Sequence, residues 1–312
     1  MTALNGSVPE ETRSDVATRY EAVETPLQRF LSDYCESRLA VVSFFVVVAI
    51  VFIAVFAPLL APTDPYDLTT VTVQDKTLPL GGTMASGQTA YLGTDGAGRD
   101  MLSAIIHGLR ISLTVGIGSG IAALFIGVCL GLIAAYAGGR VDAVIMRLVD
   151  IQLSFPAILI ALVLLATLGK GIDKTIIALI VVQWAYYART VRGSALVERR
   201  KEYIESAICL ALPKRRIVFA HLLPNVVAPI IVVGTMQTAH AITLEATLSF
   251  LGLGLPQTEP SLGSLIAKGF DYVHSGHYWI STYPGIALLI TIIAINLVGD
   301  RLRDVLNPRL QK

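Results

Sequence analysis

The sequence predicts an all-α membrane protein with six transmembrane helices. Of its 312 residues, 54% are hydrophobic and only 15% are charged, and the mean hydropathy is +0.67. This balance is typical of a polytopic membrane protein and excludes an ordinary soluble domain. The second observation is a series of long stretches without acids or bases, because a helix needs about 20 apolar residues to cross a bilayer. The net charge of +1 gives no sign of a nucleic-acid partner.

Four charge-free stretches and two less uniform ones are the predicted spans. A polar leader precedes the first, and no small-residue cleavage site follows it, so a retained anchor is predicted rather than a signal peptide. The fourth ends in Arg189 and Arg192, which can reach the membrane interface, and the fifth carries His240 and Glu245. The predicted spans are residues 39–61, 110–137, 141–169, 174–194, 224–250 and 279–300.

The distribution of Lys and Arg predicts the orientation. Six spans place both termini on one side, and that side with its flanks carries 18 basic residues against 6 opposite. Because cytoplasmic loops hold the excess of positive charge, both termini are expected in the cytoplasm. Residues 1–38 are then a cytoplasmic tail, 195–223 a cytoplasmic loop, and 62–108 and 251–278 external loops. None of the three cysteines falls in an external loop, so no disulfide is expected there.

Small residues recur at helical spacing along the second span. This pattern lets two helix backbones approach closely in lipid. Packing within one subunit is the favoured interpretation, and a subunit interface is the alternative. The residues are Gly116, Gly120, Gly127, Gly131 and Ala135.

Polar groups in or beside the spans do not form a catalytic or metal-binding pattern. Asp150 follows Arg147 by three residues, which predicts a structural ion pair on one helix face. Glu245 is expected near the outer interface, and no second acid or histidine stands at metal-ligand spacing from it. His274 and His277 are interpreted as interfacial polar residues. We therefore expect neither a catalytic residue nor a metal site.

A polar stretch, EYIESAICLALPKRRIVFAHLLPN at 202–225, separates the fourth and fifth spans. Its first part predicts a short amphipathic helix with one apolar stripe that needs a cover. Pro213 ends this helix, and the basic residues 214–216 are expected to hold a second piece at the lipid headgroups. Both an elbow lying on the membrane and a ridge docking into a soluble partner fit this pattern. The apolar stripe consists of Tyr203, Ile204, Ala207, Ile208 and Ala211.

This stretch resembles the EAA loop of permease subunits in binding-protein-dependent ABC importers. Three further segments, 92–113, 134–162 and 248–266 with 283–310, are similar in order and spacing to the C-type permease subunit of dipeptide and oligopeptide importers. Ser206, Ala211 and His221 depart from the pattern of the loop. Glu205, Ser206 and Ala207 take the E-A-A places, Ala211 the glycine place, His221 the isoleucine place, and Leu223 and Pro224 the final Leu-Pro.

The resemblance implies a type I ABC importer permease fold over residues 39–310, in the bacterial inner membrane. The implied partners are a homologous B-type permease subunit, two cytoplasmic ABC ATPases and an extracytoplasmic peptide-binding protein. The subunit itself would hold no cofactor and catalyse no reaction, and the loop of residues 195–223 would carry the coupling helix that fits a groove on the ATPase. The residues implied in coupling are Tyr203, Ile204, Glu205, Ser206, Ala207, Ile208, Ala211, Leu223 and Pro224. Candidates for the translocation path, chosen by polarity alone, are Gln183, Gln237, His240 and Asn296.

Two other functional classes are weighed against this one. A secondary transporter or channel would show inverted repeats or several charges at the midplane. A membrane enzyme would need convergent acids and histidines or a nucleophile motif. The sequence shows none of these features. Within the importer class the substrate stays open among dipeptides, longer peptides, nickel chelates, opines and some sugars.

Ala211 stands at the glycine place of the pattern, where glycine could adopt a backbone conformation that strains alanine. If the backbone there is left-handed, Ala211 is strained by roughly 1 kcal/mol relative to glycine. Replacement of Ala211 by glycine should therefore be tolerated.

Overall fold

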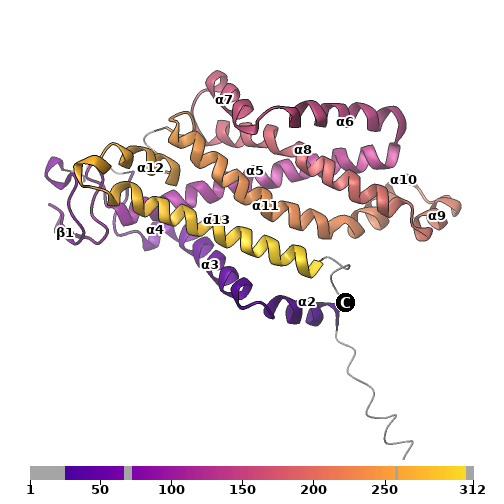
Figure 1. Cartoon of the computed structure of the whole chain (residues 1–312), viewed down its shortest axis with the longest axis horizontal. Helices are drawn as coiled ribbons and strands as arrows, with labels where there is room; N and C mark the ends of the chain where they lie inside the picture. The colour runs from indigo at the N-terminus through magenta and orange to yellow at the C-terminus, as the bar shows by residue number, and fades with distance from the viewer. Residues whose placement is uncertain (1–24, 67–71, 257–258, 307–312) are drawn as a thin grey trace, which may run out of the picture.

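The structure, a computed structural model, describes residues 25–66, 72–256 and 259–306. Long helices run along one common axis, with β1 and α12 near one end of the bundle and α9 near the other (Figure 1). Residues 1–24 of the predicted tail lie outside the described residues. The longer helices are α2 (Pro26–Cys35), α3 (Arg38–Val55), α5 (Met101–Ala137), α6 (Gly139–Ser154), α7 (Ala157–Leu168), α8 (Ile172–Arg199), α9 (Glu202–Cys209), α11 (Leu223–Phe250), α12 (Leu262–Phe270) and α13 (Trp279–Leu306). The short elements are α4 (Ala57–Leu60), η1 (Val73–Asp75), the antiparallel strands β1 (Gly82–Thr83) and β2 (Thr89–Ala90), α10 (Lys214–Arg216), the π-helix η2 (Ile217–Leu222) and η3 (Val273–Ser275).

Four helices of the described chain are long and apolar enough to cross a membrane, namely α3, α5, the helix Lys214–Phe250 and α13. The predicted third span, residues 141–169, is instead two helices, α6 and α7, bent by 89°. The bend follows from Pro156, which lacks an amide hydrogen and holds Phe155 in an extended conformation. If α6 and α7 together form one span, the described residues contain five candidate spans, and α8 is not among them. The number six therefore stays a prediction.

Two helices begin before the spans predicted for them. The second span was expected from residue 110, but α5 begins at Met101, because the Asp100 carboxylate caps it by accepting the Ser103 amide at 2.8 Å. The new helix predicted after Pro213 does begin at Lys214, but it is not separate from the fifth span, since α10, η2 and α11 form one continuous helix. Pro224 has no amide hydrogen to donate to the preceding turn, and the helix is widened into η2 directly before it.

The loop between α4 and α5 is fixed by buried polar contacts. Arg99 Nη2 lies 2.6 Å from Asp95 Oδ2, and both side chains are 5% exposed. Trp279, the first residue of α13, is buried and its Nε1 donates to the Thr94 carbonyl oxygen at 3.3 Å. The loop is therefore tied to the first turn of α13.

The glycines of α5 allow close packing within the chain, as favoured from the sequence. A Cβ at Gly127 would lie 2.7 Å from the Trp184 carbonyl oxygen, and one at Gly131 would lie 2.7 Å from the Ala188 carbonyl oxygen. Both oxygens belong to α8, so α5 and α8 touch backbone to backbone. Both helices also support α9, which is described below.

We expect Gly127→Ala to lower the free energy of unfolding by about 1–3 kcal/mol, because the added methyl group overpacks this contact. Gly118→Ala is the matched control on the same helix, since its nearest neighbour, Ile176 Cδ1, is 3.9 Å from the added carbon. Thermal unfolding of the detergent-purified protein measures both. Equal losses in the two variants would contradict the packing argument.

Candidate functional site

Helix α9 is seated on the ends of three long helices at one end of the bundle (Figure 1). Ile204 is 0% exposed and Ala207 is 5% exposed. Their side chains enter an apolar cluster that α5, α8, η2 and α11 supply, which explains why the short helix is stable beside a polar loop. The members of this cluster, besides Ile204 and Ala207, are Leu132, Ala135, Val191, Ala195, Ile217, Leu222, Val226 and Ile230.

The predicted apolar stripe of α9 is thus divided between two environments. Ile204 and Ala207 face the chain's own core and have no surface left for a partner, contrary to the expectation that the whole stripe docks. Tyr203 and Ile208 stay 38% and 47% exposed. An amphipathic pattern shows which side of a helix is apolar, but the width of the covered strip depends on the surrounding helices.

Polar contacts fasten α9 to the end of α8. The Tyr203 hydroxyl donates to Glu198 Oε1 at 2.6 Å, and Lys201 Nζ lies 2.8 Å from Glu198 Oε2. Burial, then the hydrogen bond and charge of Glu198, raise the pKa of Tyr203 to about 12, so its proton stays in this contact at neutral pH. Arg199 continues the connection by donating to the Ala135 carbonyl oxygen of α5 at 2.8 Å. These contacts tie α9 to both α5 and α8.

The outward surface of α9 combines acid and apolar groups. Glu205 and Ser206 are exposed, and the Glu205 side chain makes no hydrogen bond or ion pair within the described residues. Leu210, just after the helix, is 75% exposed. Leu223 and Pro224, also predicted for coupling, lie in the first turn of α11 and not on α9. This surface is suited to a groove with an apolar floor and a basic rim.

The backbone at Ala211 is left-handed, as expected if this is the glycine place of the pattern. Its φ is 52°. The Leu212 amide donates to the Ala207 carbonyl oxygen at 3.2 Å across this residue, which is how a left-handed residue closes a helix end. Ala211 therefore holds a conformation that glycine adopts without strain.

We expect Ala211→Gly to raise the free energy of unfolding by up to about 1 kcal/mol, because relief of the strain exceeds the extra entropy of unfolded glycine. Ala207→Gly on the regular part of α9 is the control and should lower it by about 1 kcal/mol. Thermal melting curves of the two purified variants test the pair. A lower midpoint for Ala211→Gly than for the wild type would show that the strain is not significant.

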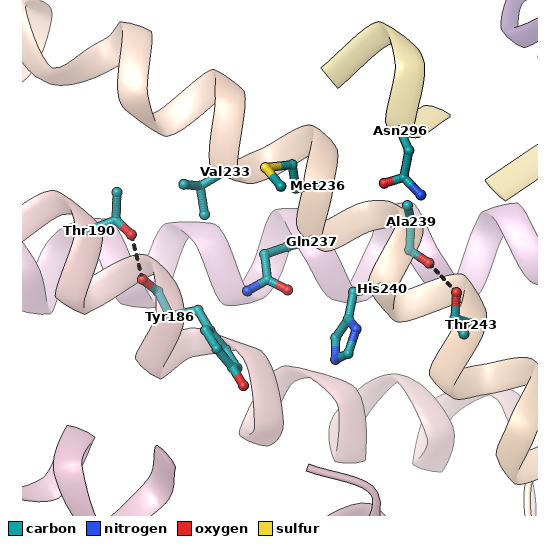
Figure 2. A pocket seen from close by; sticks show the side chains of 9 residues that line it. All are labelled: Tyr186, Thr190, Val233, Met236, Gln237, Ala239, His240, Thr243 and Asn296. Carbon is teal, nitrogen blue, oxygen red and sulfur yellow. Dashed lines mark hydrogen bonds between the residues drawn. The ribbon is translucent and has the colours of Figure 1, made fainter. Parts of the chain in front are cut away.

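A second candidate site is a pocket of about 460 Å³ between α8, α11 and α13 (Figure 2). Gln237 and His240 project into it from α11, opposite Tyr186 of α8, while Asn296 lies on the α13 side. Three of the four predicted path residues are thus together, but Gln183 does not line the pocket. The lining consists of Tyr186, Thr190, Val233, Met236, Gln237, Ala239, His240, Thr243 and Asn296.

The pocket lining combines apolar groups with uncharged polar ones and carries no acid, lysine or arginine. His240 and Thr243 are exposed although α11 is a candidate membrane span. Polar groups on a spanning helix face protein or water rather than lipid, because hydrocarbon cannot hydrogen-bond them. Sequence reasoning missed Tyr186, Thr190 and Thr243. The spacing of residues 236, 240 and 243 places them on one face of a helix, and this pattern could have identified the face of α11 that lines the pocket.

Two other sequence predictions, for Asp150 and Glu245, can be compared with the structure. Asp150 pairs with Arg189 of α8 rather than with Arg147 of its own helix. Glu245, expected near the outer interface, is 0% exposed within the bundle, close to the end of α11 at Phe250, and accepts hydrogen bonds from Ser112 and Ser249. Among the described residues no group of three or more His, Cys, Asp and Glu side chains could hold a metal ion.

The chain is similar in sequence and fold to known proteins. Residues 127–312 match the family model described as binding-protein-dependent transport system inner membrane component, and residues 25–79 match the N-terminal TM domain of oligopeptide transport permease C. The chain is 37% identical to the di/tripeptide transport system permease protein DppC of Pseudomonas aeruginosa (strain UCBPP-PA14), covering 92% of this chain and 93% of the relative. It is 39% identical to the dipeptide transport system permease protein DppC of Escherichia coli (strain K12), covering 92% and 95%. An inward-facing structure of the MetNI methionine ABC transporter has the same fold, with a TM-score of 0.55, 20% identity, and coverage of 66% of this chain and 98% of that chain.

Proposed function

Because the chain belongs to the family of binding-protein-dependent transport system inner membrane components, we propose that it forms half of a translocation path for short peptides. The protein is a non-catalytic, multi-pass permease subunit of an inner-membrane ABC importer. Such permeases work with separate ATPase subunits and a substrate-binding protein. A homologous permease subunit supplies the other half of the path, and the pocket between α8, α11 and α13 faces it.

Short peptides are the favoured substrate class. The observation that carries this proposal is the similarity, over more than nine tenths of the chain, to relatives named for dipeptides and tripeptides. The pocket adds support, because Gln237, Asn296 and Thr190 offer neutral hydrogen-bonding groups, which suit peptide amides of any side-chain charge. A peptide-binding protein outside the membrane delivers the substrate.

Helix α9 couples the conformational change of the ATPases to the permease. Its buried side is held by α5, α8 and α11, and its outer side offers Glu205 and exposed apolar groups to an ATPase groove. When ATP closes the ATPase dimer, α9 moves with it as a rigid lever and shifts the helices that line the pocket. The excess of Lys and Arg at this end favours a cytoplasmic position for α9 and both termini.

Transport in proteoliposomes tests the proposal. The permease is reconstituted with the second permease, the ATPases and the binding protein from the same cell, and ATP-dependent accumulation of a labelled dipeptide is followed. We expect accumulation that needs ATP, the binding protein and this chain together. Copurification without the ATPases would contradict the importer assembly, and accumulation of only a non-peptide solute would contradict the peptide assignment.

A further inference from the structure

The amide of Gln183 is buried in the middle of the bundle without a hydrogen bond. The residue is 0% exposed, and neither Nε2 nor Oε1 has a partner within the described part of the chain. A buried amide left unpaired carries the full penalty of lost hydration. Leu179 and Val182, its buried neighbours on α8, show that an apolar side chain packs well in this region. Stability in this conformation alone does not explain a glutamine here.

Gln183 stands next to the pocket. It precedes the pocket residue Tyr186 by one helical turn, so the two are neighbours on the surface of α8. It also precedes Tyr187 by four residues. The Tyr187 hydroxyl and Thr238 Oγ1 border the space beside Gly120, at 3.8 Å and 3.5 Å from where a Cβ would lie. Polar groups therefore continue from the pocket into the contact between α5, α8 and α11.

The depth of Gln183 matches that of the pocket. The outer ends of α8 and α11 meet, since the Gly171 amide donates to the Gly254 carbonyl oxygen at 3.3 Å. Gln183 lies 11 residues after the start of α8 at Ile172, and His240 lies 10 residues before the end of α11 at Phe250. At 1.5 Å per residue both are about 15 Å from that end, near the middle of a bilayer.

We propose that Gln183 is a substrate-contacting residue of the path that is exposed only when α8 and α11 move apart. The proposal rests on the proposed function and adds a residue to its path. A path that opens alternately to two sides must bury part of its lining in each state. A buried amide that has no partner in the closed state and is hydrated or bound to substrate in the open state lowers the free energy of the open state relative to the closed one. An amide donates and accepts, as a peptide group does, so Gln183 can pair with the substrate backbone.

State-dependent labelling of a cysteine tests the exposure. Cys35, Cys129 and Cys209 are replaced by alanine, and Gln183→Cys is introduced in the reconstituted complex. A water-soluble maleimide should label it slowly at rest and about tenfold faster when the ATPases are arrested with ATP and vanadate. Leu179→Cys, equally buried one turn away, should stay unreactive in both states, while His240→Cys should react at rest. Equal, slow labelling of Gln183→Cys in both states would overturn the proposal.

Transport by Gln183→Leu gives the second measurement. Leucine has a similar size and no unpaired polar atoms, so it should favour the closed arrangement and lower dipeptide uptake about tenfold while raising the melting temperature. Unchanged uptake would mean that an internal water, and not substrate, serves the amide. Uptake by the cysteine-free variant that still has Gln183, the parent of Gln183→Cys, separates the role of Gln183 from the proposed peptide path. Dipeptide uptake by the parent together with an unreactive Gln183→Cys overturns the role of Gln183 alone, whereas a parent that imports only non-peptide solutes overturns the peptide path itself.

Discussion

Glu205→Lys is expected to abolish substrate uptake while the ATPases still hydrolyse ATP. Glu205 is exposed on α9 and makes no contact with a base among the described residues, so its charge is free for a basic partner. Reversing a charge within an interface costs several kcal/mol, which corresponds to about a hundredfold loss of affinity or more. The fold is retained, because one charge in the first turn of a helix contributes only about 0.3–1 kcal/mol.

The measurement is paired uptake and ATP hydrolysis in proteoliposomes. Asp304→Lys is the control, since it reverses an exposed acid at the C-terminal end of α13, outside the α9 surface. The control should transport as the wild type does, and Glu205→Gln should fall between the wild type and Glu205→Lys. Wild-type uptake by Glu205→Lys at normal expression would remove the coupling role from this residue.

The sequence predicted features that depend on local chemistry. The charge-free stretches located α3 and α13, because a single acid or base is costly within a bilayer. Pro213 and the spacing of apolar residues located the end and the amphipathic nature of α9. The glycine place of the pattern drew attention to the backbone at Ala211, and the structure has the left-handed conformation there.

Features that depend on neighbouring helices could not be predicted from the sequence. Helical spacing suggested Arg147 for Asp150, but the bundle brings Arg189 of α8 closer. Pro156 could kink one long span or separate two helices, and only the packing of α7 on α8 decides. The division of the α9 stripe likewise needs the cluster around Ile204, which residues from four other elements build.

Glu245→Leu is expected to lower the free energy of unfolding by about 3 kcal/mol or more and to impair transport with it. The Glu245 carboxylate accepts from Ser112 Oγ of α5 at 2.8 Å and from Ser249 Oγ at 2.7 Å, and the hydroxyl of Ser261 is its third hydrogen-bonding neighbour. Ser261 caps α12, so one carboxylate joins three elements. Each of these hydrogen bonds contributes about 0.5–1.5 kcal/mol, and leucine would leave the hydroxyls unpaired in a buried site, at about 1–3 kcal/mol each.

Glu245→Gln separates the loss of the network from the loss of the charge. Glutamine keeps the shape, and because a serine hydroxyl can rotate to accept as well as donate, it can keep most of the hydrogen bonds. We therefore expect thermal unfolding close to the wild type for Glu245→Gln and a large loss for Glu245→Leu. If both variants melt alike and near the wild type, the carboxylate does not join the helices. If both are equally destabilised, its charge and not the hydrogen-bonded shape is required. The comparison matters for the proposed function, because a carboxylate that joins α5, α11 and α12 would make these three elements move together when the path opens on that side.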